Sequence, residues 1–571
     1  MNSIVHLEDS ASGAIVSFKV VTTWFDGSVM DDSKTDGFVY RKKADKYYCD
    51  VDFLTGSRLS CERFGVSPLH NTDVSVSFQK MLDIASKIKA KILVSAGTYY
   101  LKSHVDDYQG NYLHDNGGIS IKSNTDILFQ DAVLKALPTK EKQYNVVRLI
   151  DVKNVKIDGL VVHGERNEHI GNSGGEWGYG IYIQSSENVQ ILNSTFRDCW
   201  GDGINIQINE QAIPCKNIDL INVLCDNNRR QGMSIESGVG IRVLNSTFSN
   251  TNGTAPCCGV DIEPWGMENI VDNVVFDNCR FINNDDAGLL VMGDPVTDVR
   301  VINCYFKGNG KTSFEGQFKT VYADKLLFSG NTVYESKNIF CGILNATKSA
   351  VISNNRFIGR SIVFVDFSGR TSKNIIMENN LFNINTVTWS ALVFNGENFT
   401  IKGNTFSFLY TPADSGTASS DSFYFKVKGL NFSNNILQNN FAQMTFDTCS
   451  GVDISNNTFD NTQKKGLFIH NCSTMNIRDN VFAGIGYATA GSFLFTFSGN
   501  NSKLYLLDNH LYNKKRKPSI LDTDYPVSSF FIDTSTSDNI ILKGNVFDNM
   551  VDNTVLSLGT FSQTTTNSVI Q

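Results

Sequence analysis

The side chains best suited to chemistry are three carboxylic acids in two short, similar segments of the chain. Glu236 ends the segment GMSIE (residues 232–236), and Asp261 and Glu263 belong to GVDIE (residues 259–263). If these segments are neighbouring strands in register, Glu236 and Glu263 lie about 4.8 Å apart, one strand spacing. Like charges this close do not all ionise cheaply, so we expect one acid to keep its proton near neutral pH. A protonated acid beside a carboxylate is the condition for general acid–base catalysis.

Paired carboxylates of this kind hydrolyse glycosidic bonds, and their separation decides the stereochemistry. A separation of roughly 5–5.5 Å retains the anomeric configuration, and one of roughly 6.5–9.5 Å inverts it. The sequence is compatible with both outcomes. Asp202 precedes a glycine in the turn that enters another strand, and is either a fourth catalytic carboxylate or a turn residue. The alternative for these acids is a solvated surface or a calcium site; we predict no metal ion and no cofactor.

The position of these acids follows from an alignment of similar segments on their glycines. The segments GIYIQ (180–184), GINIQ (203–207), GMSIE and GVDIE place their second and fourth residues in the core and their third and fifth on one outer face. The two outer columns are Tyr182, Asn205, Ser234 and Asp261, and Gln184, Gln207, Glu236 and Glu263. A slip of one residue would turn the carboxylates inward, so this register is the assumption that the site depends on.

Aromatic side chains lie beside the same segments. Trp177, Trp200 and Trp265 fall in the adjoining turns and are three of only five tryptophans in the chain. Sugar rings have apolar, CH-rich faces that stack on exposed aromatic rings, so we expect these tryptophans to bind substrate. Packing in the core is the ordinary alternative for tryptophan.

Six further residues are predicted to contact substrate. Arg229 or Arg230 is suited to pair with a substrate carboxylate or to orient Glu236 through a bidentate contact. The others are Glu176 and His169 in the loop GERNEHIGNSGGEWG (164–178), and Tyr182 and Asn205 in the outer column. Surface solvation and loop polarity are the alternatives. A histidine in this loop would also serve as a lyase base if the polymer contained uronic acid.

A repeated unit fixes the architecture that positions these residues. Segments such as NVQILNSTFRDC, GIRVLNSTFSNT and GVDISNNTFDNT alternate apolar and polar residues, turn at asparagine and resume with an apolar anchor. The fourteen anchors, spaced by 22 to 36 residues, are Phe196, Leu224, Phe248, Phe281, Phe306, Val333, Phe357, Phe382, Phe406, Leu437, Phe459, Phe482, Leu511 and Phe547. A period of two followed by a corner predicts strands rather than helices.

One such coil cannot bury its own apolar face, so neighbouring coils must stack. Propeller blades need about 40 residues or more, and helical repeats need a helical period that is absent here. Asparagine suits the corners because it tolerates left-handed backbone angles and hydrogen-bonds to its own main chain. We therefore predict an all-β fold, a right-handed parallel β-helix of about fourteen or more coils.

The chain is expected to divide into four parts. Residues 1–60 lack the repeat and form a small N-terminal segment, and residues 61–91 form a connector with one amphipathic capping helix. That helix, DVSVSFQKMLDIASKIKAK (73–91), carries apolar residues at near-helical spacing, from Val76 and Phe78 to Ala85. Residues 92–550 form the β-helix with the catalytic flank, and residues 551–571 form a C-terminal cap or a contact between subunits.

Composition excludes several classes of protein. The net charge of −8, with scattered basic residues, argues against a nucleic-acid partner. No run of eighteen apolar residues occurs, so we expect a soluble protein without membrane insertion. The twelve cysteines form no CxxC pair and are predicted to be reduced core thiols. No GxSxG segment occurs, and the eight histidines follow no nucleophile pattern.

Two stretches resemble known families. The run from RFGV (63–66) through the predicted helix to ILVSAGTYYL (92–101) resembles the start of the pectate-lyase-like β-helix superfamily, with Ser95 and Ala96 where proline is usual. The segments GEWGYGIYI (175–183), CWGDGINI (199–206), NRRQGMSI (228–235) and CCGVDIEP (257–264) are similar to consecutive coils of bacteriophage tailspike depolymerases, especially those directed at the capsule of Klebsiella or related bacteria. The resemblance covers about residues 60 to 310.

The resemblance implies a homotrimeric tailspike on the phage virion that binds and cleaves host capsular polysaccharide. The short N-terminal segment would then dock on another tail protein. The residues themselves favour endo-glycosidic hydrolysis by Glu236, Asp261 and Glu263. The alternatives are a polysaccharide lyase, which needs a uronic acid and a His, Tyr or Lys base, and a receptor-binding spike without enzymatic activity.

Overall fold

The structure is a computed structural model of the chain. It divides the chain into two compact units, Met1–Asp285 and Asp286–Gln571. The described residues are 4–9, 13–69, 71–104, 117–171, 174–293, 296–310, 316–334, 340–365, 371–384, 392–408, 422–439, 443–460, 466–483, 493–513, 529–533, 538–549, 557–560 and 569–570.

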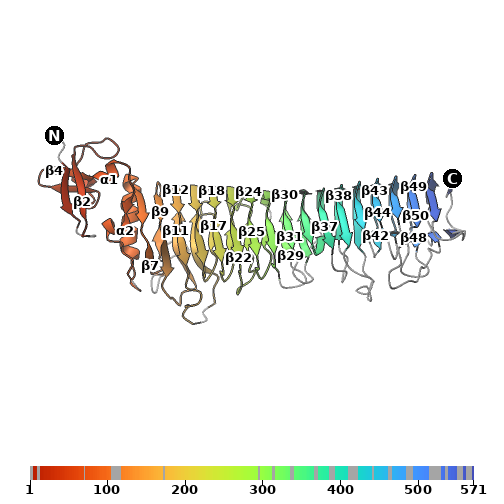
Figure 1. Cartoon of the computed structure of the whole chain (residues 1–571), viewed down its shortest axis with the longest axis horizontal. Coiled ribbons are helices and arrows are strands. Elements are labelled where there is room, and N and C mark those ends of the chain that lie inside the picture. The colour runs from red at the N-terminus through yellow and green to blue at the C-terminus, as the bar shows by residue number, and fades with distance from the viewer. Residues whose placement is uncertain are drawn as a thin grey trace. The chain divides into compact units, whose positions relative to one another are not determined.

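A small antiparallel sheet opens the first unit (Figure 1). Its strands follow the order β1 (Ile4–Glu8), β2 (Ile15–Val21), β4 (Lys46–Asp50) and β3 (Tyr40–Lys43). Three short helices accompany the sheet, η1 (Asp32–Lys34), α1 (Val51–Leu54) and η2 (Cys61–Phe64). Phe18 of β2 and Cys49 of β4 are fully buried. The sheet lies within residues 1–60, where the repeat is absent.

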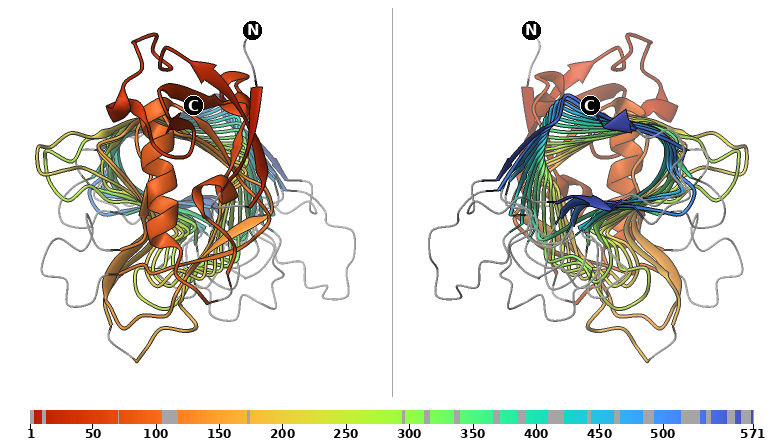
Figure 2. Two further views of the ribbon diagram at one scale, coloured as in Figure 1. Left: turned by 90° about the vertical axis from the view of Figure 1, so that its left-hand side faces the viewer. Right: turned by 90° about the vertical axis from the view of Figure 1, so that its right-hand side faces the viewer.

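The predicted amphipathic helix is confirmed as α2 (Ser75–Ile88), which lies beside the first coils in the end-on view (Figure 2). Its buried face carries Phe78, Met81, Leu82, Ala85 and Ile88. Val76 is not part of that face, since it is 82% exposed in the first turn. The side-chain amide of Gln79 donates to the carbonyl of Ser120 at 3.0 Å and accepts from its N–H at 2.7 Å. The helix therefore satisfies backbone groups that the first coils leave unpaired.

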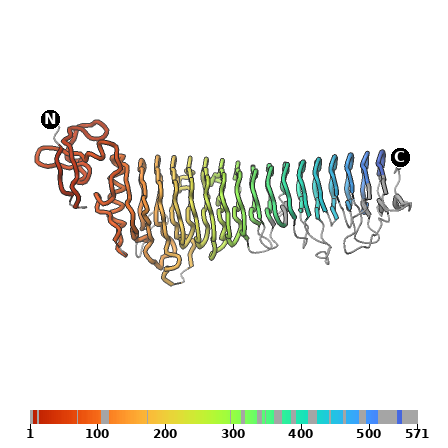
Figure 3. Tube along the Cα trace, in the orientation of Figure 1, coloured from red at the N-terminus to blue at the C-terminus, as the bar shows by residue number. Residues whose placement is uncertain are grey.

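The rest of the first unit consists of parallel coils, as predicted, traced in Figure 3. Column 1 contains β7 (Gly97–Leu101), β10 (Ala132–Ala136), β13 (Val161–His163), β16 (Thr195–Arg197), β19 (Leu224–Asp226), β22 (Thr247–Ser249) and β25 (Arg280–Ile282). Column 2 contains β5 (Leu59–Ser60), β6 (Lys91–Val94), β9 (Asp126–Phe129), β12 (Lys153–Asp158), β15 (Glu187–Leu192), β18 (Cys215–Ile221), β21 (Gly238–Leu244) and β24 (Val271–Asp277). Column 3 contains β8 (Ile119–Ser120), β11 (Gln143–Ile150), β14 (Trp177–Gln184), β17 (Ile204–Gln207), β20 (Met233–Ile235) and β23 (Val260–Ile262).

The second unit repeats the same three columns. Column 1 contains β28 (Tyr305–Lys307), β31 (Thr332–Tyr334), β34 (Arg356–Ile358), β37 (Leu381–Ile384), β39 (Thr405–Phe408), β41 (Ile436–Gln438), β44 (Thr458–Asp460), β47 (Val481–Ala483), β50 (His510–Asn513) and β53 (Val546–Asn549). Column 2 contains β27 (Val296–Ile302), β30 (Leu326–Ser329), β33 (Ala350–Ser353), β36 (Ser372–Glu378), β43 (Ser450–Ser455), β46 (Ser473–Arg478), β49 (Ser502–Leu507), β52 (Asp538–Lys543) and β55 (Val569–Ile570). Column 3 contains β26 (Leu289–Met292), β29 (Gly316–Ala323), β32 (Phe340–Thr347), β35 (Arg360–Val365), β42 (Met444–Asp447), β45 (Leu467–His470), β48 (Phe493–Ser498), β51 (Ser529–Asp533) and β54 (Ser557–Thr560), while β38 (Leu392–Lys402) and β40 (Phe423–Ser433) each serve columns 2 and 3.

The predicted anchors lie on column 1, and one of them is wrong by a residue. In the second unit they pair in an unbroken row from Phe306 to Phe547. In the first unit Phe196 and Phe248 both pair with Cys225, whose side chain is fully buried. Leu224, the predicted anchor of that coil, points outward. The error arose because both residues of the pair are apolar, so the period of two did not distinguish them.

Asparagine performs two separate roles at the corners. In the Asn-Asn pairs of the second unit, Asn354 and Asn379 adopt the left-handed conformation, with φ of 56° and 55°. The next residues, Asn355 and Asn380, are buried. Asn355 Nδ2 donates to the side-chain oxygen of Asn380 at 2.9 Å and to the carbonyl of Phe328 at 2.8 Å. The predicted corner role is confirmed, and a buried amide ladder is added to it.

All twelve cysteines are free and buried, as predicted. No helix in the described ranges is long and apolar enough to cross a membrane. Most of residues 551–571 lie outside the described residues. Within them β54 and β55 pair in parallel with β51 and β52, so the coils continue beyond the predicted boundary at residue 550.

Candidate functional site

Column 3 of the first unit has the register that the sequence predicts. Asn205 pairs with Ser234, and Ser234 pairs with Asp261. Just after the strand ends, the backbone N–H of Glu236 donates to the carbonyl of Ile206 at 2.8 Å, and that of Glu263 donates to the carbonyl of Ile235 at 3.0 Å. The second and fourth residues of each segment point into the core and are fully buried: Ile181, Ile183, Ile204, Ile206, Met233, Ile235, Val260 and Ile262. Glu236 and Glu263 therefore occupy equivalent positions on neighbouring coils.

A pocket of about 440 Å³ opens over these strands. Its lining residues are Glu176, Trp177, Arg230, Ser234, Glu236, Glu263, Pro264 and Trp265. They come from the residue before β14 and its first residue, the turn before β20, β20 and the residue after it, and the segment after β23. Six of them were predicted as site residues from the sequence. The structure therefore brings three predicted acids, Arg230 and two predicted tryptophans to one pocket.

Glu236 is the most constrained acid of the pocket. It is 7% exposed, and its carboxyl group accepts hydrogen bonds from three side chains. Asn205 Nδ2 donates at 2.9 Å, the indole Nε1 of Trp265 donates at 2.8 Å, and Gln207 Nε2 also donates. Burial raises the pKa of Glu236, and the three donors act in the opposite direction. A carboxyl group with a raised pKa that still reaches a pocket is suited to act as a general acid.

Asp261 lies behind Glu263 rather than in the pocket lining. It is 1% exposed, and Gln231 Nε2 donates to its Oδ2 at 2.8 Å. Burial raises the pKa of Asp261 well above its ordinary value, and the charge of Glu263 adds to this effect. Asp261 is thus placed to hold a proton against Glu263, which is half-buried and reaches the pocket.

Asp202 and Arg230 form an ionic layer beneath the pocket. Asp202 is fully buried and accepts from the hydroxyl of Ser234 at 2.7 Å. Arg230 lies 3.4 Å from Asp202 through one terminal nitrogen and 3.3 Å from Glu176 through Nε. Burial raises the pKa of Asp202, while the guanidinium of Arg230 lowers it. Asp202 therefore contacts Arg230 and Ser234 and is not among the residues that line the pocket.

The three tryptophans have different environments. Trp265 is 74% exposed at the pocket rim, and Trp177 is half-buried in the lining. Trp200 is 7% exposed. His169 stacks on its ring at 3.6 Å, and the guanidinium carbon of Arg229 lies 3.9 Å from the ring centroid, so the two cover opposite faces. The prediction of an exposed stacking platform is wrong for Trp200, because its ring fills a gap between the loop and the coil.

Arg229 and His169 belong to this buried cluster and not to the pocket. Arg229 donates to the carbonyls of Gly175 at 2.7 Å and Trp200 at 3.0 Å. His169 Nδ1 lies 3.0 Å from Glu165, a fully buried acid that also accepts from the hydroxyl of Tyr144. Arg229 and His169 are therefore not among the residues that line the pocket, and their predicted contact with substrate stays a prediction. They fix the loop that carries Glu176 and Trp177 to the pocket.

The expected open face is covered along its first column. Tyr182 and Asn205 are fully buried, and Ser234 is 3% exposed. The hydroxyl of Tyr182 donates to Gln207 Oε1 at 2.6 Å, which orients the amide that contacts Glu236. Tyr182 and Asn205 point away from the coil interior, as predicted, but they support Glu236 and do not contact the pocket.

Four supporting residues escaped the sequence analysis as site residues: Gln207, Gln231, Glu165 and Tyr144. Gln207 stood in the same outer column as Glu236, and this was the signal that could have identified it. Glu165 lies in a polar loop where nothing in the sequence indicates burial. Within the described part of the chain, no group of three or more His, Cys, Asp or Glu residues is arranged to hold a metal ion.

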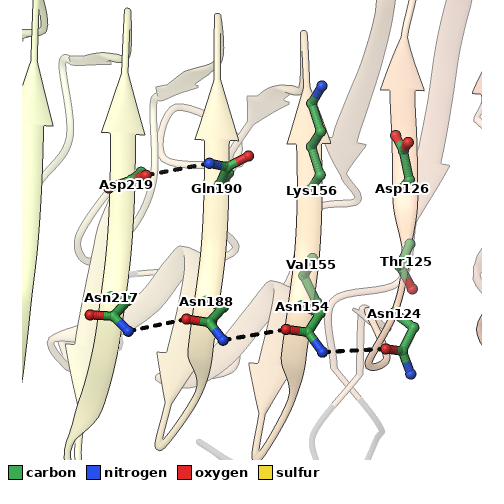
Figure 4. Close-up of a pocket in the computed structure, with 10 residues that line it drawn as sticks. All are labelled: Asn124, Thr125, Asp126, Asn154, Val155, Lys156, Asn188, Gln190, Asn217 and Asp219. Carbon is green, nitrogen blue, oxygen red and sulfur yellow. Dashed lines mark hydrogen bonds between the residues drawn. The ribbon is translucent and has the colours of Figure 1, made fainter.

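A second pocket of about 310 Å³ lies on column 2 of the same unit (Figure 4). Its lower row is a ladder in which the side chains of Asn154, Asn188 and Asn217 each donate to the preceding asparagine, ending at Asn124. The acids above the ladder are engaged, because Arg58 pairs with Asp126 and Arg242 makes two hydrogen bonds with Asp219. This pocket holds no carboxyl pair of the kind found on column 3.

Sequence comparison places the chain among known proteins. Residues 103–276, 270–406 and 388–509 match the family described as right-handed β-helix region. An uncharacterised protein, YclG of Bacillus subtilis, is 26% identical over 377 residues, 61% of this chain and 62% of that protein. A prophage-derived uncharacterised protein of the same organism, YorA, is 26% identical over 263 residues, 42% of this chain and 43% of that protein. The chain thus spans less than two thirds of either relative.

Solved structures with a similar fold include three phage proteins. The tailspike protein gp49 of Acinetobacter baumannii bacteriophage Fri1, a capsular polysaccharide depolymerase, is 14% identical with a TM-score of 0.41, over 76% of this chain and 69% of that one. Pre-mature gene product 12 of bacteriophage phi29 is 13% identical with a TM-score of 0.46, over 87% and 73%. A double mutant of the tailspike protein of E. coli bacteriophage HK620 is 13% identical with a TM-score of 0.37, over 90% and 82%. On the family match and its parallel coils, the chain belongs to the right-handed β-helix family.

Proposed function

We propose that this protein binds a polysaccharide across the column 3 pocket and hydrolyses a glycosidic bond within the polymer. One observation carries the proposal. The register of β20 and β23 places Glu236 and Glu263 on neighbouring coils, and both line one pocket beside the exposed ring of Trp265. Two carboxyl groups that reach the same bond, with an aromatic face beside them, are what glycoside hydrolysis requires.

The two glutamates take different roles because their environments differ. Glu236 is almost fully buried, and its raised pKa suits it to protonate the glycosidic oxygen as the bond breaks. Glu263 is more open and acts as the base that activates water, or as the nucleophile. Asp261 holds its proton beside Glu263, because burial and the charge of Glu263 both raise its pKa. Asp202 contributes indirectly, through its contacts with the guanidinium of Arg230 and the hydroxyl of Ser234.

The pocket is less suited to a lyase reaction. A lyase needs a base such as histidine, tyrosine or lysine close to the proton next to a uronate carboxyl group. The lining residues of the pocket include none of these three types. His169 lies in the buried cluster with Glu165, and its side chain is 1% exposed. Hydrolysis therefore agrees better with the side chains that reach the substrate.

The biological setting is part of the proposal. We propose that the polymer is a bacterial capsular polysaccharide, that the protein acts as a homotrimeric tailspike on a phage virion, and that residues 1–60 attach it to another tail protein. The motif resemblance between residues 60 and 310 supports this setting. Deletion of residues 1–55 is expected to abolish incorporation into virions while the remaining chain still binds polymer. Normal incorporation of the deleted protein would contradict the attachment role.

The test of the catalytic proposal is cleavage of purified capsular polysaccharides, followed by size-exclusion chromatography and mass spectrometry. The wild-type protein is expected to release oligosaccharides with new reducing ends and without the ultraviolet absorbance of an unsaturated product. Glu236→Gln and Glu263→Gln should each reduce the rate by about 10²–10⁴-fold. Glu187→Gln is the matched control, because Glu187 is an acid on column 2 that pairs with Lys153. Full activity in both pocket variants would refute the assignment, and unchanged polymer with binding would indicate a receptor-binding spike.

A further inference from the structure

Carboxyl groups outnumber basic groups around the pocket. Three of the lining residues are acids, Glu176, Glu236 and Glu263, and Arg230 is the only basic lining residue. Two more acids contact these residues from behind, Asp202 at Arg230 and Asp261 at Glu263. A ligand that enters the pocket therefore meets more carboxyl groups than cationic groups.

The one basic group already has partners of its own. Arg230 lies 3.3 Å from Glu176 and 3.4 Å from Asp202, and only 14% of its side chain is exposed. Arg229, the neighbouring base, points into the cluster around Trp200 and donates to backbone carbonyls. Arg230 is thus engaged by two carboxyl groups, and Arg229 is not among the residues that line the pocket.

A uronic acid in this pocket would bring a further negative charge against Glu176 and Glu263. Like charges juxtaposed in an interface oppose binding, and no uncommitted cation of the lining offsets them. An uncharged sugar has the opposite fit. Its hydroxyl or N-acetyl N–H groups donate to carboxylates, which are acceptors only. Its apolar face is complementary to the exposed ring of Trp265, which the hydrogen bond to Glu236 holds in place.

We infer that the pocket accepts an uncharged sugar at the bond to be cut, and that any uronic acid of the polymer lies outside the pocket. This inference rests on the proposed polysaccharide function and adds the substrate class. It goes beyond cleavage itself, because it predicts which polymers and which bonds of a mixed polymer are bound.

The test uses pairs of polymers that differ only in charge. Capsular polysaccharides that contain uronic acid are prepared in native form and after chemical reduction of their carboxyl groups to primary alcohols, together with polymers that contain no uronic acid. Binding to the full-length protein is measured by isothermal titration calorimetry with Glu236→Gln, so that slow cleavage does not disturb the signal. We expect polymers with uronate at the bound segment to bind at least about tenfold more tightly after reduction.

The variant Glu176→Gln tests whether the acids of the lining cause this difference in affinity. Glu176→Gln removes one acid of the lining and one partner of Arg230. The ratio of the affinity for reduced polymer to the affinity for native polymer should therefore fall by at least about threefold. Glu187→Gln, the surface control paired with Lys153, should leave the ratio unchanged. A ratio that does not respond to Glu176→Gln would contradict the electrostatic argument.

The outcomes separate this inference from the proposed function. Stronger binding of reduced polymers without cleavage by the wild-type protein would refute hydrolysis and support the charge argument. Cleavage of native polymer at a uronate, with loss of cleavage after reduction, would refute the inference and leave an enzyme. No binding of any of the polymers, native, reduced or free of uronic acid, would overturn both.

Discussion

Replacement of Trp265 by phenylalanine isolates the contact that connects substrate binding to the proposed acid. Trp265→Phe keeps an exposed aromatic face at the pocket rim but removes the indole N–H that donates to Glu236 at 2.8 Å. That hydrogen bond favours the ionised form of Glu236 and so lowers its pKa. Its loss should therefore raise the pKa of Glu236 further and hold the proton on the acid to higher pH.

The size of this effect follows from the nature of the contact. Hydrogen bonds to charged groups contribute about 1.5–3 kcal/mol, and water partly replaces a donor that stands at an exposed rim. We therefore take a loss of about 1.4 kcal/mol, which corresponds to about a tenfold gain in proton affinity. Because the acid must be protonated to act, the alkaline limb of the pH–rate profile should move to higher pH.

The assay is the pH dependence of kcat/KM on a polysaccharide that the wild-type protein cleaves. Trp265→Phe should move the alkaline limb while KM changes little, and Trp265→Ala should move the limb and also raise KM, because the stacking face is lost. Trp177→Phe is the matched control, since Trp177 is a pocket tryptophan for which no hydrogen bond to an acid is found in the structure. An unshifted limb in a folded Trp265→Phe protein would refute either the role of the contact or that of Glu236 as the acid.

Three further predictions concern stability. Burial and Glu263 raise the pKa of Asp261 above its ordinary value of 3.8, so the folded state loses stability as pH rises from that value towards the raised pKa. Asp261→Asn should therefore raise the melting temperature at neutral pH, and this gain should vanish below pH 3.8. A difference in melting temperature that does not depend on pH would contradict the linkage. Trp200→Ala should lower the unfolding free energy by about 3–5 kcal/mol in urea titrations, because it empties a buried site between His169 and Arg229; a loss as small as that of the half-buried Trp177→Ala control would argue against its structural role. Asn355→Ala should cost about 3 kcal/mol, because the buried carbonyl of Phe328 loses its donor and Asn331 loses the acceptor of two hydrogen bonds. The neighbouring Asn354→Ala, which loses left-handed backbone preference, should cost less, about 1 kcal/mol. An equal or larger loss in Asn354→Ala would refute the ladder.

The fold was predictable because its period is local. In segments such as GINIQ and GMSIE, alternate residues reveal which side of the strand faces the core, and Ile204 and Met233 are fully buried as expected. The same rule failed at Leu224 and Cys225, where two apolar residues follow each other. Only the pairing of Cys225 with Phe196 and Phe248 identifies the inward residue.

The site was predictable in its strands and not in its loops. Register and alternation placed Glu236 and Glu263 together, because both positions follow from the repeat. Trp200, Arg229 and His169 were assigned to substrate because nothing in a polar loop sequence shows that it folds back on itself. His169 is held by Glu165, a buried acid whose other partner, Tyr144, lies 21 residues earlier in the chain.

The most direct test of the central claim is polysaccharide cleavage in water enriched in oxygen-18. Hydrolysis by Glu236 and Glu263 transfers an oxygen atom of water to each new reducing end, while the new non-reducing end keeps the original glycosidic oxygen, so mass spectrometry should find the heavy isotope at the new reducing ends only. Glu263→Gln should give no labelled product on the same timescale, while Glu187→Gln should give the wild-type yield. Products that form without the isotope, or labelled products at the wild-type rate from Glu263→Gln, would contradict hydrolysis by this carboxyl pair.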